Sequence, residues 1–314
     1  MFVRGDKFTV ATTLLLGGFV VALFSGLLEK DEPVDGTGDE GISSVEVFRV
    51  PLFAEDVPLR QPESVTDTSD LMSRRITGGV VPHHLLASEL LAEFFRLLGE
   101  RAQQPRTIIL LAPNHFEVGS ANVQTVEFFW ETPYGQVATD SEILRRLLET
   151  TNATPTPESF RNEHGIYNIL PYIAHFLPST KVVPVILRYG TSAREIGGLV
   201  DFLKPLVETG EVLVVSSVDF SHYLPKEESD KKDSDTLRAM RNYDLSRIAD
   251  FQSDHLDSPV TILTLLRIGQ EADAREIRVL RHGNSADQAR GSHDSTTGHF
   301  SFFLTDLEKE STGE

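Results

Sequence analysis

The sequence predicts a single three-layer α/β domain with a mainly parallel β-sheet, preceded by one N-terminal transmembrane helix. Apolar runs of strand length alternate with segments of helical periodicity from residue 45 onward. These runs are apolar throughout, as in strands that helices cover on both faces, and together the two observations predict the domain. A third observation predicts the membrane helix, because residues 8–28 form a stretch without any charged side chain.

Residues 8–28, FTVATTLLLGGFVVALFSGLL, are long enough to cross a bilayer as a helix, for which about 20 apolar residues suffice. Arg4 and Lys7 precede the stretch, and a positively charged flank stays on the cytoplasmic side. A cleaved signal peptide is the alternative, although its apolar region usually has about 7 to 15 residues before an A-x-A-like site. We therefore expect residues 1–28 to be a membrane anchor or signal segment, with the anchor favoured and the domain on the extracytoplasmic side.

The rest of the chain divides into an acidic linker at residues 29–44, the α/β domain at 45–308 and a short tail at 309–314. The linker is rich in Gly, Pro and Ser, a composition typical of flexible, solvated segments. The net charge of −18 and the lack of a basic patch argue against a nucleic-acid partner. The chain of 314 residues contains no cysteine, so any metal ion must be held by His, Asp or Glu.

The elements of the domain follow from their apolar patterns. Residues 45–53 are predicted to form an outer strand, and residues 56–74 a polar loop. Further strands are predicted at residues 77–81, 107–112, 123–130, 181–187, 211–218, 275–281 and 298–304. Helices are predicted at residues 85–98, 140–148, 165–177, 193–208, 232–251 and 259–268.

A histidine closely follows each of three buried strands. These residues are His83, His115 and His222. Ligands of a parallel sheet bind at the carboxyl ends of its strands, so we expect the three imidazoles to converge on one crevice. Two or three His with a carboxylate suit non-haem Fe(II) or catalytic Zn(II). Asp219 is a candidate ligand, a partner that orients a ligand, or a simple turn cap.

Two further segments place polar residues at predicted helix starts. RNEHGIYNILP contains Glu163 and His164, a candidate general acid/base pair where a helix N-terminus favours an anion. In SDHLDSPVTILTLL, Asp257 and Ser258 are expected to cap a helix ahead of its first-turn proline. That interpretation leaves His255 without a structural explanation.

Six segments carry a resemblance to a known family. VVPHHLLASELLAEFF is similar to a P-H-A-G-Y strand–turn–helix, IILLAPNHF to G-P-S-H-H, and FFWETPYGQVATD to W-x-T-P-x-G-x-x-x-x-D. EHGIYNILPYI is similar to E-H-S-I-E-x-x-L-P-[FY], and KVVPVILRYG and VVSSVDFSHYLP match the strand and the S-S-D-F-x-H segment that follow. Over about residues 76–305, the chain resembles the Memo family, also called AmmeMemoRadiSam system protein B, which is related in fold to the class III extradiol ring-cleavage dioxygenases.

The resemblance implies an α/β domain whose site holds a divalent metal ion between two His and one Cys. His83 and His115 take the two His positions, and the segment HLDSP places His255 at the Cys position. The remaining polar positions of the cleft are taken by Glu163, His164, Asp219 and His222.

The sequence departs from the family pattern at several positions. Leu85 stands where the family has Gly, and Phe116 replaces the second His of G-P-S-H-H. Tyr167 replaces the second Glu of E-H-S-I-E, and Val218 is inserted into S-S-D-F. The most important change is His255 for Cys, because a thiolate in an oxidising compartment is vulnerable to oxidation whereas an imidazole is not.

These observations predict an exported, membrane-tethered, metal-dependent oxidoreductase. The predicted ligands of its divalent ion are His83, His115 and His255, with iron favoured and copper or zinc as alternatives. The four other polar residues of the cleft are predicted to be catalytic, as acid/base or oxyanion partners for a small molecule or peptide. The alternative is a non-catalytic metal-binding or protein-recognition module with a degenerate dioxygenase-like cleft.

Overall fold

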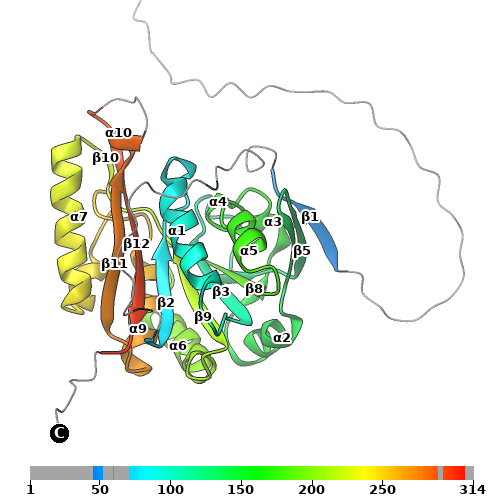
Figure 1. Ribbon diagram of the computed structural model, residues 1–314. Coiled ribbons are helices and arrows are strands. Elements are labelled where there is room, and N and C mark those ends of the chain that lie inside the picture. The colour runs from blue at the N-terminus through cyan, green and yellow to red at the C-terminus, as the bar shows by residue number, and fades with distance from the viewer. Residues whose placement is uncertain (1–44, 52–58, 60–70, 72, 289–292, 308–314) are drawn as a thin grey trace, which may run out of the picture. The chain divides into compact units, whose positions relative to one another are not determined.

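The computed structural model describes most of the predicted domain (Figure 1). The expected membrane segment, linker and tail lie outside the described residues. Among the residues that are described, no helix has the length and apolar character needed to span a membrane. The described residues are 45–51, 59, 71, 73–288 and 293–307.

Four parallel strands form the centre of a nine-stranded sheet. β2 contains two glycines because helices press on both of its faces. A Cβ at Gly78 would lie 2.6 Å from Leu265 Cδ1, and one at Gly79 would lie 2.6 Å from Phe94 Cε2. The four strands, in spatial order, are β2 (Ile76–Val81), β9 (Val212–Ser217), β3 (Thr107–Pro113) and β8 (Lys181–Leu187).

The strands on either side of the central four run antiparallel to them, so the sheet is mixed and the expectation of a mainly parallel sheet needs correction. One long strand, β12, pairs antiparallel with both β2 and β11. On the other side of the sheet, β4 pairs antiparallel with β8. The outer strands are β4 (Val123–Thr125), β7 (Thr154–Pro155), β10 (His222–Leu224), β11 (Glu276–Asn284) and β12 (Thr296–Thr305).

Residues 123–130, predicted as one strand, divide between two sheets. β4 ends at Thr125 in the main sheet, and β5 belongs to a separate three-stranded sheet of order β1-β5-β6. The rings of Phe48, Phe128 and Trp130 pack together there with centroids 5.1–5.3 Å apart. This aromatic cluster stabilises the small sheet. Its strands are β1 (Glu46–Arg49), β5 (Phe128–Thr132) and β6 (Gly135–Ala138).

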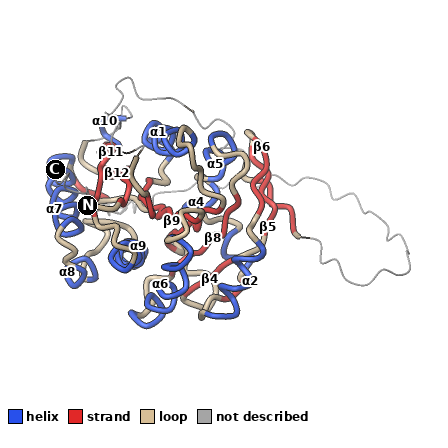
Figure 2. Tube along the Cα trace, turned by 60° about the horizontal axis from the view of Figure 1, so that its bottom comes forward, coloured by secondary structure: helices blue, strands red, loops and turns tan. Residues whose placement is uncertain are grey.

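Helices cover both faces of the main sheet and produce three layers (Figures 1 and 2). On β3, Ile108 and Leu110 join one apolar cluster while Ile109 and Leu111 join another, since successive side chains of a strand point to opposite faces. The first cluster includes α1 (Ser88–Gly99), α4 (His164–Tyr167) and α5 (Leu170–Phe176). The second includes α2 (Ser141–Thr150), α6 (Ala193–Val207) and α9 (Pro259–Glu271).

Two predicted helices are each divided in the structure. The helix expected at 232–251 starts earlier and breaks before Asp244, whose side chain accepts a hydrogen bond from the Arg247 backbone and starts a new helix. The segment 165–177 divides into α4 and α5, with Pro171 in the first turn of α5, because proline lacks the N–H that a helix interior requires. The remaining helices are η2 (Leu85–Ala87), α3 (Pro157–Phe160), α7 (Lys226–Arg241), α8 (Leu245–Ala249) and α10 (Ser285–Gln288).

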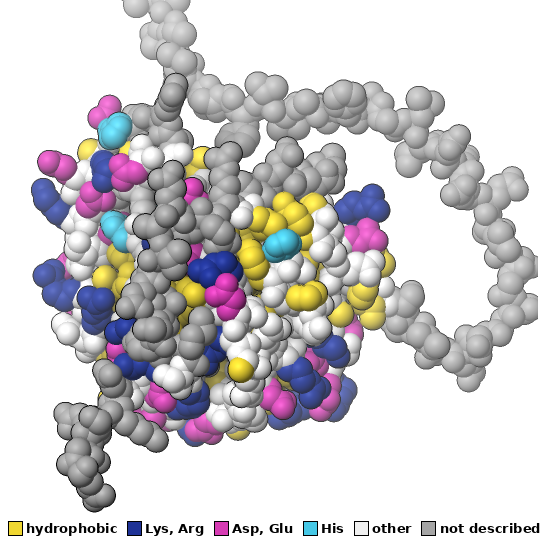
Figure 3. All heavy atoms as spheres, viewed as in Figure 1, with side chains coloured by type: hydrophobic (Ala, Val, Ile, Leu, Met, Phe, Trp, Pro, Cys, Tyr) yellow, Lys and Arg dark blue, Asp and Glu magenta, His cyan; other side chains and the backbone are white. Residues whose placement is uncertain are grey.

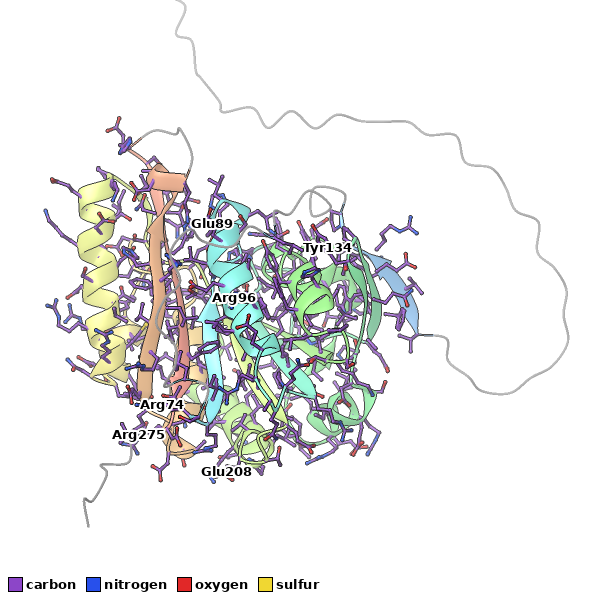
Figure 4. All side chains as sticks on the ribbon, in the orientation of Figure 1. Arg74, Glu89, Arg96, Tyr134, Glu208 and Arg275 are labelled. Carbon is purple, nitrogen blue, oxygen red and sulfur yellow. The ribbon has the colours of Figure 1, made fainter. Side chains whose placement is uncertain are left out.

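The parallel strands begin at one end of the sheet layer and finish at the other. Figure 4 labels a residue near each end. Arg74 precedes the amino end of β2, and Glu89 lies in the first turn of α1, beyond the carboxyl end of β2. The loops that follow β2, β3 and β9 carry His83, His115 and Asp219 to the carboxyl ends of the strands. On the face that Figure 3 shows, Lys and Arg side chains are interspersed with Asp and Glu. The expectation of no nucleic-acid partner stays a prediction.

Candidate metal centre

His83 and His115 lie just past the ends of β2 and β3, and a hydrogen bond fixes each ring. His83 Nδ1 lies 3.2 Å from Ser217 Oγ at the end of β9. His115 Nδ1 lies 2.6 Å from Glu163 Oε1. With both Nδ1 atoms engaged, each ring presents Nε2 to the space between them, and the ring centroids are 4.8 Å apart.

Glu163 is the side chain that orients His115. Its Oε2 accepts the backbone N–H of His115 at 3.0 Å, and its Oε1 accepts the N–H of Gly165 at 2.9 Å as the N-cap of α4. Gly165 makes room for this carboxylate, because a Cβ there would lie 3.0 Å from Ala112 Cβ and 3.1 Å from Glu163 Oε1. A metal-ligating histidine usually donates its Nδ1–H to a group such as this carboxylate, which leaves Nε2 free for the metal ion.

Asp257 supplies an oxygen atom between the two free Nε2 atoms. Its Oδ2 lies 3.2 Å from His83 Nε2 and 3.7 Å from His115 Nε2. Two ligand atoms bound about 2.1 Å from one ion at tetrahedral or octahedral angles lie about 3.0–3.4 Å apart, so the first separation fits and the second is slightly long. Asp257 Oδ1 is buried and has no hydrogen-bond partner among the described residues. His83, His115 and Asp257 therefore form a candidate two-His, one-carboxylate site.

His255, the third predicted ligand, does not lie at this site. Its Nδ1 lies 2.9 Å from Asp254 Oδ1, and its ring stacks on Phe251 at 4.1 Å. Leu256 is fully buried and forms a bridge with Phe220, which fixes the register of the turn. As a result Asp257, after Leu256, faces the imidazoles instead of His255 before it. The structure therefore brings His83 and His115 together with Asp257, and not with His255.

His164 lies beside the other two imidazoles. Its ring stacks on His115 with centroids 4.1 Å apart and lies edge-on to His83 at 5.0 Å. Ring or carboxylate atoms of His83, His115 and His164 lie within 4.8 Å of one another, as do those of His83, Asp219 and Asp257. Burial and the neighbouring His83 and His115 lower the pKa of His164 to about 4, so this ring is neutral near pH 7.

Asp219 lies against His83 and leads to a second group of imidazoles. Its Oδ1 accepts the His83 backbone N–H at 3.1 Å, and its Oδ2 lies 3.4 Å from His83 Nε2. Ligand atoms of Asp219, His84 and His299 lie within 4.8 Å of one another. His222 interacts electrostatically with the same three residues, so the structure places it in this second group.

The charges of His83, His115 and Asp257 favour the exchange of protons for a bound cation. Burial alone lowers the pKa of His115, but hydrogen bonds to Asp257 and Glu163 raise it to about 10. The pKa of His83 is also raised, because Asp219 and Asp257 outweigh the effect of burial. Burial opposes ionisation of Asp257, but the contacts with His115 and His83 hold its pKa well below its usual range. Two imidazolium charges next to buried carboxylates are what a divalent ion would replace on binding.

Comparison with known proteins identifies the family. The family model described as Memo-like protein matches residues 61–302. This chain belongs to the Memo-like family. The match confirms the resemblance that the six sequence segments indicated.

The Memo-like chain is similar to proteins from several archaea and to one solved bacterial structure. A MEMO1 family protein of Caldivirga maquilingensis is 27% identical over 217 residues, which cover 66% of this chain and 76% of that protein. A MEMO1 family protein of Methanococcoides burtonii is 28% identical, with 69% of this chain and 83% of that protein covered. The crystal structure of uncharacterized protein JW3007 from Escherichia coli K12 has a TM-score of 0.51 and 15% identity, and covers 73% of this chain and 100% of its own. At that identity the likeness is one of fold alone.

Four residues without a predicted site role lie beside the predicted site residues in the structure. Asp257 was expected as a helix cap, yet Ser258 alone caps α9, with its side chain accepting the Thr261 N–H. That redundancy was the available signal for a second role of Asp257. The others are Ser217 and His84, which stand in segments that carry the family resemblance, and His299, which lies within β12.

Proposed function

We propose that this Memo-like protein is a metal-dependent oxidoreductase whose divalent ion is held by His83, His115 and Asp257. The observation that carries the proposal is the position of Asp257 Oδ2, 3.2 Å from His83 Nε2 and 3.7 Å from His115 Nε2. The chain has no thiol, and a nitrogen and oxygen donor set of this kind favours Fe(II), with zinc or copper as alternatives. An ion bound there supplies Lewis acidity and open positions for a small ligand.

The residues around this set have separate tasks in the proposed reaction. Ser217 and Glu163 hold the two ligand rings with Nε2 inward. His164 is neutral near pH 7 and is partly open to solvent, so it is the group that accepts a proton from a hydroxyl of the bound molecule. Phe116 lies next to His164, with ring centroids 6.4 Å apart, and supplies an exposed apolar wall for that molecule.

The proposed location is the extracytoplasmic face of a membrane, with residues 1–28 as the anchor. The support is the charge-free stretch at 8–28 with Arg4 and Lys7 before it. Protease treatment of intact cells or spheroplasts tests the proposal: the domain should be digested from outside and should stay with the membrane fraction before digestion. A domain that is protected in intact spheroplasts would contradict the orientation.

Metal analysis of the purified full-length chain tests the function. We expect about one equivalent of a first-row divalent metal to depend on His83 and Asp257, and to be lost in His83→Ala and Asp257→Asn. His255→Ala is the matched control, because this histidine lies apart from the site, and it should keep its metal. If both ligand variants keep full metal content, the proposed site is wrong. Oxygen uptake by the loaded protein with catechols and related hydroxylated substrates then tests the reaction class.

A non-catalytic metal-binding protein is the second candidate. Phe116 favours it, since a phenyl ring that is 56% exposed stands where the resemblance implies a histidine, which removes one acid/base group from the site. Metal that binds to the first site with no oxygen uptake across the substrate panel would support this candidate over the enzyme.

A further inference from the structure

The second group of imidazoles around Asp219 has no role in the proposed reaction. It consists of His84, His222 and His299 together with the carboxylate of Asp219. From its geometry we infer a second divalent-cation site, formed by His84, Asp219 and His299 and bordered by His222. The inference does not depend on the proposed function, although Asp219 lies close enough to His83 and Asp257 to contact an ion at the first site as well.

His299 gives the first argument. It lies within β12 and is fully buried, and neither of its ring nitrogens has a hydrogen-bond partner among the described residues. A neutral imidazole always carries one N–H donor and one lone pair, and leaving a buried polar group without a partner destabilises the folded protein. A bound cation removes this penalty on one nitrogen, because the lone pair becomes a ligand.

The spacing of the donor atoms gives the second argument. One ring nitrogen each of His84 and His299 and one carboxylate oxygen of Asp219 all lie within 4.8 Å of one another. The ring centroids of His84 and His299 are 5.5 Å apart. Three donors at such separations can close around one ion with small side-chain movements. The set of two imidazoles and one carboxylate suits a first-row divalent metal rather than Ca²⁺ or Mg²⁺, which prefer oxygen ligands.

The positions of the donors in the fold give the third argument. His84 follows β2, Asp219 follows β9 and His299 lies inside β12, which pairs with β2. Donors on adjoining strands of one sheet are held in place by the sheet itself. His222, at the start of β10, has a buried Nδ1 that also has no partner in the described part of the chain. It is the fourth imidazole available to an ion at this position.

Asp219 connects the second site with the first. Its Oδ2 lies 3.4 Å from His83 Nε2, and its Oδ1 accepts the His83 backbone N–H at 3.1 Å. A carboxylate shared by two ligand groups is the arrangement of two-metal centres, whose ions lie about 3.5–4 Å apart. The structure therefore supports a paired centre, in which the second ion is added from the side of His84, the least buried of the three donors.

Zn²⁺ titration of the full-length, metal-stripped protein tests the inference. We expect two equivalents to bind the unaltered chain and one to bind His84→Ala or His299→Phe. His84→Ala changes an exposed residue, so it keeps the test valid even if His299→Phe fails to fold. His255→Ala is the control and should bind two equivalents. In crystals soaked with Zn²⁺, anomalous scattering should show a peak between His84 and His299.

The variants also separate this inference from the proposed function. His115→Ala should lose one equivalent while keeping the second site, and His84→Ala should do the reverse. If the unaltered chain binds one equivalent that His115→Ala removes and His84→Ala leaves in place, the second group binds no cation and the inference is overturned. If the unaltered chain binds one equivalent that His84→Ala and His299→Phe remove and His115→Ala leaves in place, the second site is confirmed and the proposed first site is wrong.

Discussion

The carboxylate of Glu163 holds His115 by its ring and by its backbone at the same time. Oε1 lies 2.6 Å from Nδ1, and Oε2 accepts the backbone N–H at 3.0 Å. The side chain that caps α4 is thus the one that directs Nε2 of His115 toward Asp257. A local feature of helix formation and the orientation of a candidate ligand depend on one residue.

Glu163→Gln should weaken Zn²⁺ binding at the first site by roughly ten- to a hundred-fold. An amide can accept only one of the two His115 donors, and its NH₂ group faces the other. Competition with a chromogenic chelator measures the affinity. Glu195→Gln is a suitable control, because Glu195 belongs to the capping box of α6. Unchanged affinity in Glu163→Gln would show that this carboxylate does not orient the ligand.

Gly165→Ala should disturb the same carboxylate from behind. The new Cβ would lie 3.0 Å from Ala112 Cβ and 3.1 Å from Glu163 Oε1. We expect the free energy of unfolding to fall by about 1–3 kcal/mol, together with a lower Zn²⁺ affinity. Gly198 is the matched control, since a Cβ there meets nothing within 4 Å and its helix should gain about 0.5–1 kcal/mol from alanine. Urea denaturation measures the free energy of unfolding of both variants. Equal values for the two would contradict the packing argument.

Asp257→Asn should lower the pKa of His115 in the metal-free protein. Contacts with Asp257 and Glu163 together raise this pKa to about 10 against the effect of burial, and an amide removes the charge of one partner. NMR titration of the His115 ring protons measures the change. His255→Ala should leave the titration as it is, because its ring contacts Asp254 instead. A pKa that stays near its original value would mean that Glu163 alone raises it.

Stability of the metal-free protein should fall with acidity because of His299. Burial lowers the pKa of this ring from 6.5 to about 4, so the unfolded chain takes up a proton below pH 6.5 that the folded chain accepts only near pH 4. Between these values the unfolded state is favoured increasingly, by a total of about 3 kcal/mol. His299→Phe should lose less stability between pH 7 and pH 4.5, as followed by urea denaturation. Parallel curves for the two proteins would contradict this expectation.

The sequence was sufficient to predict that His83, His115, Glu163 and His164 lie close together. His83 and His115 could be found because the carboxyl ends of parallel strands meet, and Glu163 and His164 because a helix starts beside them. The choice between His255 and Asp257 was not accessible. It depends on the burial of Leu256, and the local sequence does not show which neighbour of a buried loop residue faces the imidazoles.

Long-range pairing explains the other differences. His299 lies in a strand whose residues are almost all buried, so it had the pattern of a core position, and only the pairing of β12 with β2 brings it toward His84. The break between β4 and β5 depends on the separate sheet that β1 offers to β5. Neither strand pairing can be predicted from the residues of the strands themselves. The membrane segment at 1–28, which lies outside the described residues, stays a prediction.

The sharing of Asp219 has a thermodynamic consequence. A single negative charge cannot be given in full to two cations, so an ion on one side alters the affinity on the other. Such coupling is reciprocal: whatever factor the first ion imposes on the second, the second imposes on the first. The two sites therefore fill over a different range of free metal concentration than two independent sites would. If the ions favour each other, both sites fill over a narrower range; if they oppose each other, the range is wider.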